Sequence, residues 1–190
     1  MKASGAPALE IRELTPELWP AFEKLFGPNG ACAGCWCMWW RIPEGERFEQ
    51  IHGAEAKRRQ KALVLAGRSR GLLAFAGSEP VGWCAYGRRT EFAVLARSRT
   101  LACDDADKVW SLPCFFIKAG WRGRGVGRAL LRAALKVLKA RGARTAEAYP
   151  VRPPATNASA FTGTVPWLES EGFRTLTTWP RGRQRARRTL

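Results

Sequence analysis

The sequence contains no long hydrophobic run. No segment of its 190 residues approaches the roughly 18 consecutive apolar residues that a membrane-spanning helix needs. The first residues, MKASGAPALEIRELT, also lack the hydrophobic core of a secretory signal peptide. We therefore expect a soluble, cytoplasmic protein that does not bind membranes.

The sequence is also poor in metal ligands. It has one histidine, His52, and no second CxxC pair to match Cys32 and Cys35. These two cysteines and Cys37 lie close enough to suggest zinc, but half of a four-ligand site is missing. We expect no bound metal, and we expect the six cysteines to be reduced thiols that pack as small hydrophobic groups. A zinc site at these positions is the alternative.

Acidic residues are scarce, with 16 against 32 basic residues and a net charge of +16. This excess favours a polyanionic partner such as nucleic acid or an acidic protein, although a solvated arginine-rich surface explains it more simply. An apolar content of 46% with nine tryptophans is sufficient for one hydrophobic core. Five arginines fall within residues 181–190, where apolar residues are almost absent. We expect one domain at residues 1–180, followed by a mobile basic tail at residues 181–190.

Residues 109–141 carry the most informative pattern. An apolar run, a turn rich in glycine and arginine, and a segment with apolar residues at helical spacing follow one another, which predicts a strand, a tight turn and a helix. A Walker A loop requires GxxxxGK, which neither Gly120 nor Gly123 begins. The dinucleotide motif GxGxxG fails at Arg128 and Leu130. Nucleotide hydrolysis and hydride transfer therefore lose their support.

Within the turn, Arg122, Gly125 and Gly127 form the pattern RxxGxG, and Gly123 adds a third glycine. Glycines allow backbone N–H groups to converge at the start of a helix, where the helix dipole also favours anions. The turn therefore predicts a site for a diphosphate. A glycine turn that only lets a helix pack closely on a strand is the alternative.

This strand, turn and helix resemble motif A of the GNAT acetyltransferase superfamily, in which Arg or Gln precedes xxGxG or xxGxA. Farther along the chain, a short strand at residues 145–149 and a helix that ends before Gly172 and Phe173 resemble the last elements of that family. The resemblance covers roughly residues 70–178. It implies a GNAT-like α/β (α+β) fold, with a mixed, twisted central β-sheet flanked by helices.

The expected elements follow the order of that family. Alternating apolar and charged residues predict the first strand, and Thr15 followed by Pro16 predicts the start of the first helix. In chain order we expect a strand at 8–13, helices at 16–27 and 45–67, strands at 71–76, 81–86 and 109–118, a helix at 126–141, a strand at 145–149, a helix that ends at 171, and a final strand.

The resemblance also implies how acetyl-CoA binds as the acyl donor. In the family, the amides of the turn bind its pyrophosphate, and the strand before the turn pairs with its pantetheine arm. A backbone N–H near the end of that strand stabilises the oxyanion that forms during transfer. The residues at the matching positions are Phe115, Phe116, Ile117, Lys118, Arg122, Gly123, Arg124, Gly125, Val126, Gly127 and Arg128.

The segment ACAGCWCMWW concentrates aromatic and thioether side chains in Trp36, Met38, Trp39 and Trp40. Such a cluster packs in a core or lines a pocket for an apolar or cationic substrate. In GNAT proteins this region covers the acceptor site, so we expect these four residues to line the substrate pocket. The segment also resembles a cysteine-aromatic signature of bacterial GNAT proteins.

The resemblance implies an N-acetyltransferase in which a primary amine attacks the thioester directly, in a ternary complex with acetyl-CoA. The tyrosine that often protonates the leaving thiolate in this family is replaced by Leu168. Tyr149, at the end of the expected strand, is therefore the candidate acid. Asp105 and Asp107 are the candidate bases, with Glu147 as the reserve.

A second function stays open. A catalytically silent GNAT-fold module that binds nucleic acid or a ribosomal particle would use the basic surface directly. Leu168 favours this module, whereas the intact RxxGxG pattern favours the enzyme. The acceptor amine is unidentified, and a homodimer is kept as a possibility.

Overall fold

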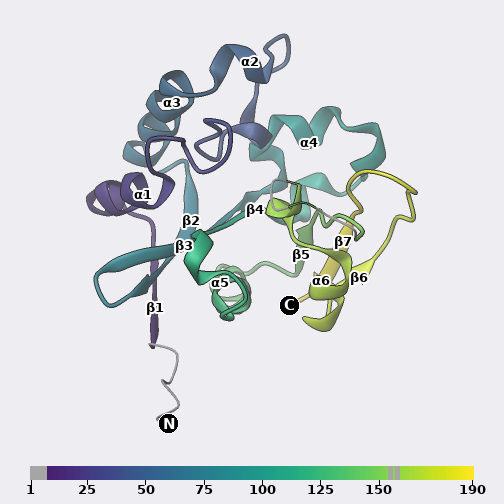
Figure 1. Ribbon diagram of the computed structural model, residues 1–190. Helices are drawn as coiled ribbons and strands as arrows, with labels where there is room; N and C mark the ends of the chain where they lie inside the picture. Colours follow the sequence, from purple (N-terminus) through teal and green to yellow (C-terminus); the bar gives the residue numbers. More distant parts are fainter. Residues whose placement is uncertain (1–7, 154–155, 157–158) are drawn as a thin grey trace.

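The computed structural model describes residues 8–153, 156 and 159–190. A mixed sheet of seven strands forms its centre, and α-helices lie on both faces (Figure 1). The strands are β1 (Leu9–Glu13), β2 (Arg70–Ala76), β3 (Glu79–Arg88), β4 (Trp110–Ile117), β5 (Thr145–Ala148), β6 (Arg174–Thr175) and β7 (Ala186–Thr189). The α-helices are α1 (Trp19–Phe26), α2 (Phe48–Ile51), α3 (Ala54–Leu65), α4 (Ala93–Arg97), α5 (Val126–Ala140) and α6 (Val165–Ser170).

The strands lie in the order β1-β2-β3-β4-β5-β7-β6. Neighbouring strands are antiparallel except β4 and β5, which are parallel. This exception follows from α5, because two parallel strands in one sheet need a long crossover connection between them. The mixed, twisted sheet flanked by helices confirms the predicted fold class.

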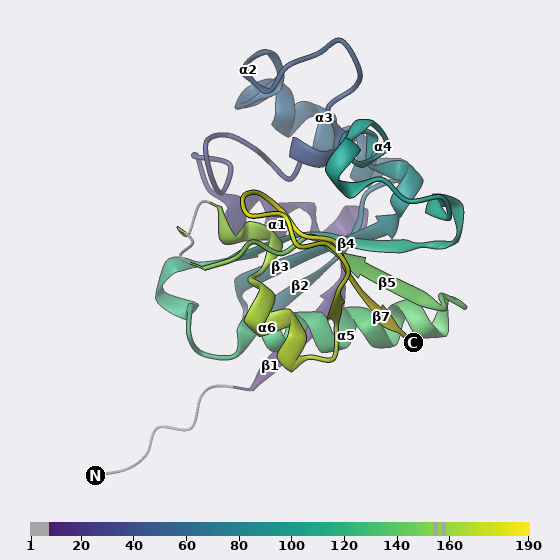
Figure 2. The same ribbon diagram turned by 90° about the vertical axis from the view of Figure 1, so that its right-hand side faces the viewer.

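The sheet separates two hydrophobic cores. Side chains alternate along β2, so Leu73 and Phe75 belong to one core while Leu72 and Ala74 belong to the other. The first core contains buried residues of α1 to α4, and the second contains those of α5 and α6. Figure 2 shows α5 along one face of the sheet, with α3 and α4 beyond the other. None of the described helices combines the length and the apolarity that crossing a membrane requires.

Gly82 on β3 lets α5 approach the sheet closely. A Cβ atom at this position would lie 2.7 Å from Val126 Cγ1 and 2.9 Å from Leu130 Cδ1. Both contacts are shorter than a side-chain atom tolerates, so a larger residue would force the Val126 and Leu130 side chains, or the helix that carries them, to shift. Because Val126 is the first residue of α5, Gly82 also fixes where the turn before α5 lies.

Residues 181–190 do not form the mobile basic tail that the sequence predicted. Ala186–Thr189 forms β7, which pairs with β5 on one side and β6 on the other. The guanidinium of Arg187 donates to Asp105 and Glu147 at distances of 2.6 to 2.9 Å. The prediction was wrong because these acidic partners are distant in sequence, and they neutralise Arg187, one of the five arginines that favoured a solvated tail.

Candidate active site

An opening forms where β4 and β5 separate. The two strands pair only as far as Leu112 and Ala148, whereas β4 continues to Ile117. Its last five residues therefore have β3 on one side and, among the residues that the structure describes, no strand on the other. An uncovered strand edge can pair with the backbone of a peptide or an amide-containing ligand.

The backbone of β4 presents alternate residues to this opening. Lys118 donates its N–H toward β3, to the carbonyl oxygen of Val81 at 3.0 Å. Because backbone groups alternate along a strand, those of Phe115 and Ile117 point the opposite way, toward the opening. The Ile117 carbonyl oxygen accepts a hydrogen bond from Nε of Arg122 at 3.1 Å, which agrees with this direction. The Phe115 and Ile117 N–H groups are therefore directed into the space beside β4.

The predicted turn connects β4 to α5. It contains a short 3-10 helix, Ala119–Trp121, and two glycines with left-handed backbone, Gly123 with φ +73° and Gly125 with φ +79°. Gly125 is the N-cap residue of α5. Within the described part of the chain, the backbone N–H groups of residues 123–128 have no hydrogen-bond acceptor. These donors, together with the positive end of the helix dipole, form a site suited to an anion.

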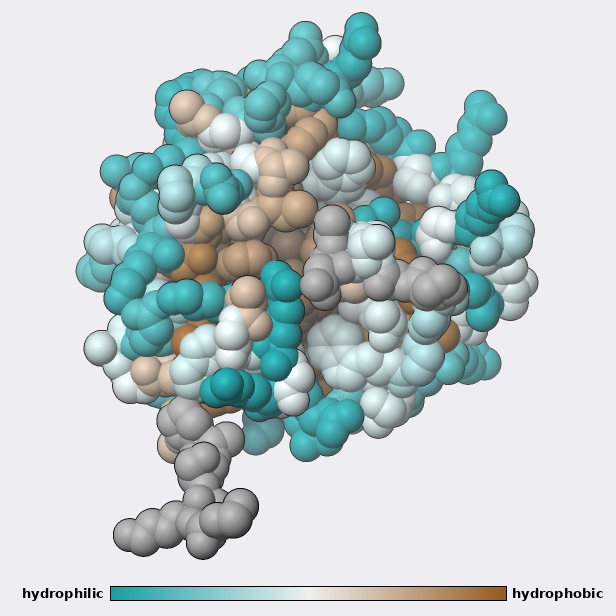
Figure 3. All heavy atoms as spheres, viewed as in Figure 1, coloured by the Kyte–Doolittle hydropathy of each residue, from teal (hydrophilic) through white to brown (hydrophobic). Residues whose placement is uncertain are grey.

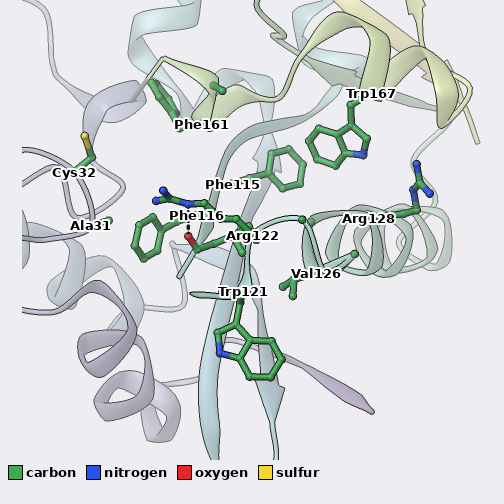
Figure 4. A pocket seen from close by; sticks show the side chains of 15 residues that line it. Ala31, Cys32, Phe115, Phe116, Trp121, Arg122, Val126, Arg128, Phe161 and Trp167 are labelled. Atoms are coloured by element: carbon green, nitrogen blue, oxygen red, sulfur yellow. Dashed lines mark hydrogen bonds between the residues drawn. The ribbon is translucent and has the colours of Figure 1, made fainter. Parts of the chain in front are cut away.

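A cleft of about 690 Å³ extends from this turn along β4. We call it the main cleft, and Figure 4 shows that aromatic side chains from β4, the turn, η7 (Ala160–Thr162) and α6 surround it. Its lining residues are Ala31, Cys32, Phe115, Phe116, Ile117, Trp121, Arg122, Gly123, Gly125, Val126, Gly127, Arg128, Ala160, Phe161 and Trp167.

Two of the predicted donor-site residues, Lys118 and Arg124, do not line the main cleft. The ammonium group of Lys118 pairs with Glu79 at 2.5 Å, and the guanidinium of Arg124 lies over the Trp121 ring at 5.4 Å. Sequence reasoning missed Trp121, although it lies inside the glycine turn.

Sequence reasoning also missed Phe161 and Trp167, because they belong to segments with no local motif. In the structure, the Trp167 ring packs edge-on against Phe115, with 5.0 Å between ring centroids. This contact closes the side of the main cleft that β5 leaves open.

Arg128 lines the main cleft and is fixed in place by α6. Its Nε lies 2.7 Å from the carboxylate of Glu171, and Nε of Arg132 lies 2.8 Å from the other carboxylate oxygen. The hydrogen bond from Arg132 lowers the pKa of Glu171, which keeps this buried carboxylate ionised. The pair of arginines and Glu171 therefore joins the first turns of α5 to the end of α6.

A second cavity, of about 260 Å³, adjoins the main cleft. We call it the apolar cavity, because aromatic rings, small side chains and thiols form its wall. Figure 3 shows the molecule from the side seen in Figure 1. The centre of this face is hollowed and brown, the colour of hydrophobic residues. The lining residues are Phe26, Ala31, Cys32, Ala33, Cys35, Cys37, Trp39, Phe48, Cys114, Phe115, Phe116, Phe161 and Arg183.

The predicted pocket residues divide between this cavity and the core. Trp39 lines the apolar cavity, whereas Trp36, Met38 and Trp40 are buried in the core that faces α1. The ring of Trp36 stacks on Phe26 with 5.7 Å between centroids. Trp40 donates its indole N–H to the carbonyl oxygen of Pro113 on β4, at 2.8 Å.

All six cysteines are free thiols. Cys32, Cys35 and Cys37 lie in the wall of the apolar cavity, together with Cys114 from β4. Burial raises the pKa of the Cys35 thiol to about 11. Among residues 8–153, 156 and 159–190, no group of three or more His, Cys, Asp and Glu side chains is placed to hold a metal ion.

The candidate acid Tyr149 and the reserve base Glu147 lie in a buried polar network. The Tyr149 hydroxyl is within 2.5 Å of Ser111 Oγ and donates to Glu147 at 2.9 Å. Glu147 also pairs with Arg89 at 3.5 Å and Arg187 at 2.6 Å. Tyr149 and Glu147 are fully buried, and neither lines the main cleft or the apolar cavity. Burial raises the pKa of Tyr149 well above its ordinary value.

The candidate bases Asp105 and Asp107 also lie outside both cavities. Asp105 accepts two hydrogen bonds from Arg187, which lowers the pKa of its carboxyl group to about 2. Asp107 is exposed to solvent. The structure therefore brings the donor-site residues together at one cleft, but it does not place the four acid and base candidates there.

Sequence comparison connects these features with a known family. A model of the acetyltransferase (GNAT) family matches residues 33–162 of the chain. This range includes β4, the glycine turn and α5, which form the main cleft. A search of curated protein sequences found no match.

Solved structures share the fold over nearly the whole chain. A GCN5-related N-acetyltransferase from Kribbella flavida aligns with a TM-score of 0.59 and 22% identity, over 96% of this chain and 98% of its own. An acetyltransferase from Thermus thermophilus aligns with a TM-score of 0.55 and 21% identity, over 96% and 97% of the two chains. PaiA N-acetyltransferase from Thermoplasma acidophilum, in complex with coenzyme A, aligns with a TM-score of 0.52 and 16% identity, over 96% and 99%.

Proposed function

The chain belongs to the acetyltransferase (GNAT) family, and we propose that it transfers an acetyl group from acetyl-CoA to a primary amine by direct attack in a ternary complex. One observation carries the proposal: the unpaired amides of residues 123–128 and the uncovered edge of β4 border the same cleft. The first can hold a diphosphate, and the second can pair with an extended amide chain, so together they match the diphosphate and the pantetheine arm of the donor.

In this proposal the diphosphate of acetyl-CoA binds at the N-terminus of α5. The open N–H groups of the turn supply the hydrogen bonds, and Arg122 and Arg128 supply positive charge at the rim of the cleft. The pantetheine arm then runs along β4, where the backbone groups of Phe115 and Ile117 face the opening. The coenzyme A complex of the Thermoplasma acidophilum protein supports this choice of donor.

The reaction needs a neutral amine, whose nitrogen forms a bond to the thioester carbon while the carbonyl π electrons move onto the oxygen. An N–H group of Phe115 or Ile117 stabilises the resulting oxyanion. The carbonyl then re-forms and the carbon–sulfur bond breaks. The electrons of the broken bond leave on the coenzyme A thiolate, and the proton of the amine passes through water to that thiolate.

The described residues that line the two cavities include no carboxylate and no histidine. We therefore propose that solvent in the cleft removes the proton, and that an amine with a lowered pKa reacts faster. Tyr149, Glu147 and Asp105 then stabilise the sheet rather than exchange protons with the substrate, because their polar groups pair with one another and with arginines.

Other expectations remain proposals. The net charge of +16 favours a polyanionic partner in addition to the donor. A homodimer and a cytoplasmic location are further predictions. The silent binding module is the second candidate function, and it is favoured by the absence of a carboxylate or histidine from the described residues of the cavity walls.

Thiol release from acetyl-CoA in the presence of a panel of primary amines tests the proposed function. We expect release that depends on the amine, and we expect a Gly125→Glu variant to lose it because a carboxylate would occupy the anion site. Gly120→Glu is the matched control, because Gly120 has open space around it and does not line the main cleft. If the wild type binds acetyl-CoA but no amine increases thiol release, the silent module becomes the better account.

A further inference from the structure

Arg183 is an unusual component of the apolar cavity. It lies in the segment before β7 and lines the cavity, and its guanidinium lies over the ring of Phe161, another residue of the wall. Its Nε is buried without a hydrogen-bond partner, and no carboxylate of the described residues lies within 4.0 Å of its nitrogens. In contrast, Arg187 in β7 pairs with Asp105 and Glu147. Arg183 therefore holds a partly buried charge that the described chain does not neutralise.

Such a charge is costly to bury without a partner. The guanidinium of Arg183 lies over the rings of Phe161 at 4.6 Å and Trp40 at 5.4 Å, which offsets part of the lost hydration. Burial lowers the pKa of Arg183, although a guanidinium stays protonated in proteins. The aromatic contacts fix the orientation of the group, and they leave the buried Nε–H without an acceptor.

No described residue of the cavity wall accepts a hydrogen bond from that Nε–H. Apart from Arg183, the wall consists of aromatic rings, alanines and thiols, and it contains no carboxylate. The volume of about 260 Å³ suits a small molecule with an apolar body.

The apolar cavity opens onto the place where the reaction would occur. Phe115, Phe116 and Phe161 belong to the walls of both the apolar cavity and the main cleft. A molecule in the apolar cavity therefore lies beside the end of β4, where the thioester is expected. This adjacency makes the cavity a place for the acceptor rather than for the donor.

We propose that the apolar cavity is the acceptor subsite and that Arg183 binds a carboxylate of the acceptor, which is a small primary amine that carries an aromatic ring and a carboxylate group. This assignment rests on the proposed function. A carboxylate fits better than a phosphate, because a phosphate needs several charged or strong donors and the described wall offers one guanidinium. The aromatic body would pack against Phe26, Trp39 and Phe48, which leaves the amine free to face the main cleft.

Binding of 3-phenylpropanoate and of its uncharged analogue 3-phenylpropanol tests the assignment without any turnover. Titrations that follow tryptophan fluorescence compare the wild type with Arg183→Met and with the control Arg181→Met, whose arginine is exposed on the same segment. We expect the carboxylate to bind the wild type and Arg181→Met, and to bind Arg183→Met about 10- to 100-fold more weakly. The alcohol should bind all three proteins weakly and about equally.

Equal affinity of the wild type for the acid and the alcohol would overturn the proposal, as would unchanged acid binding by Arg183→Met or no acid binding at millimolar concentration. If Arg183→Met does not fold, Arg183→Lys replaces it. Lysine keeps the charge but loses the planar fork, so we expect weaker acid binding and an unchanged affinity for the alcohol.

A second measurement connects the subsite with activity. We expect L-phenylalanine to be acetylated with a higher kcat/KM than 2-phenylethylamine, and Arg183→Met to remove that preference. A wild-type preference for 2-phenylethylamine would contradict the proposal. Acid binding at Arg183 without any turnover would instead count against the proposed acetyl transfer, so the two failures are distinguishable.

Discussion

Replacing Gly125 by alanine tests the role of the turn before α5. Gly125 has φ +79°, and no atom lies within 4 Å of a Cβ added there. The methyl group therefore has room, and the cost comes from the left-handed backbone, which disfavours an L-residue by about 1 to 2 kcal/mol. For a chain of this length we expect the melting temperature to fall by about 2 to 8 °C.

The same change should weaken the binding of acetyl-CoA. The left-handed conformation at Gly125 directs the first amides of α5 into the main cleft, and a backbone that relaxes away from it loses part of that array. Loss of one hydrogen bond to a charged group corresponds to an affinity about 10- to 150-fold lower. Isothermal titration calorimetry with acetyl-CoA measures this loss directly.

Gly127→Ala is the matched control. Gly127 lies inside α5, and the nearest atoms to an added Cβ belong to Trp167, at 3.6 Å. Alanine is a better helix former than glycine by about 0.5 to 1 kcal/mol, so we expect a slightly higher melting temperature and largely retained binding. If Gly125→Ala kept both the stability and the acetyl-CoA affinity of the wild type, the reasoning about the turn would be refuted.

Three further changes test other parts of the account. Gly82→Ala should cost about 1 to 3 kcal/mol in unfolding free energy and weaken acetyl-CoA binding, because the methyl group displaces Val126 at the start of α5; urea denaturation and calorimetry check both effects, and an unchanged stability would contradict the close contact. The pair of Asp105 with Arg187 stabilises the wild type above about pH 4, and this stability is lost as the pH falls toward the lowered pKa of about 2. Asp105→Asn should remove this contribution to the unfolding free energy. Because the Asp105 side chain is 43% exposed, the difference should stay below about 1 kcal/mol, and identical pH profiles for wild type and variant would show that the pair contributes nothing. Tyr149→Phe should lower the unfolding free energy by about 1 to 3 kcal/mol while leaving kcat nearly unchanged, and a large loss of kcat would restore this tyrosine as the acid.

The sequence was sufficient to predict the parts of the site that depend on local pattern. The strand, turn and helix of residues 109–141 were predicted because left-handed glycines and helical spacing are properties of a few consecutive residues. The hairpin of β2 and β3 was predicted for the same reason.

Features that depend on distant residues could not be predicted. The last strand, β7, was read as a tail, because the acids that pair with Arg187 come from Asp105 and Glu147. The placement of Arg183 in the apolar cavity likewise depends on contacts with Trp40 and Phe161, which lie far away in sequence.

The aromatic segment at residues 36–40 shows why composition alone cannot say which residues line the pocket. Trp36, Trp39 and Trp40 are equally apolar in sequence, yet the first and last are buried in the core and Trp39 lines a cavity. The left-handed backbone of Trp36 and Cys37, with φ +47° and +64°, changes the direction of successive side chains. No period of two or of 3.6 applies to such a loop, so the sequence could not assign each ring to one side.

The most direct test of the central claim is the melting temperature with and without saturating acetyl-CoA, with ATP and NAD as controls. A ligand that binds only the folded state stabilises it by RT ln(1 + [L]/Kd), which is about 4 kcal/mol for micromolar affinity at millimolar concentration. For this chain length we expect acetyl-CoA to raise the melting temperature by about 8 to 16 °C, and we expect ATP and NAD to have much smaller effects. No rise with acetyl-CoA, or an equal rise with all three ligands, would contradict the assignment of the main cleft as the donor site.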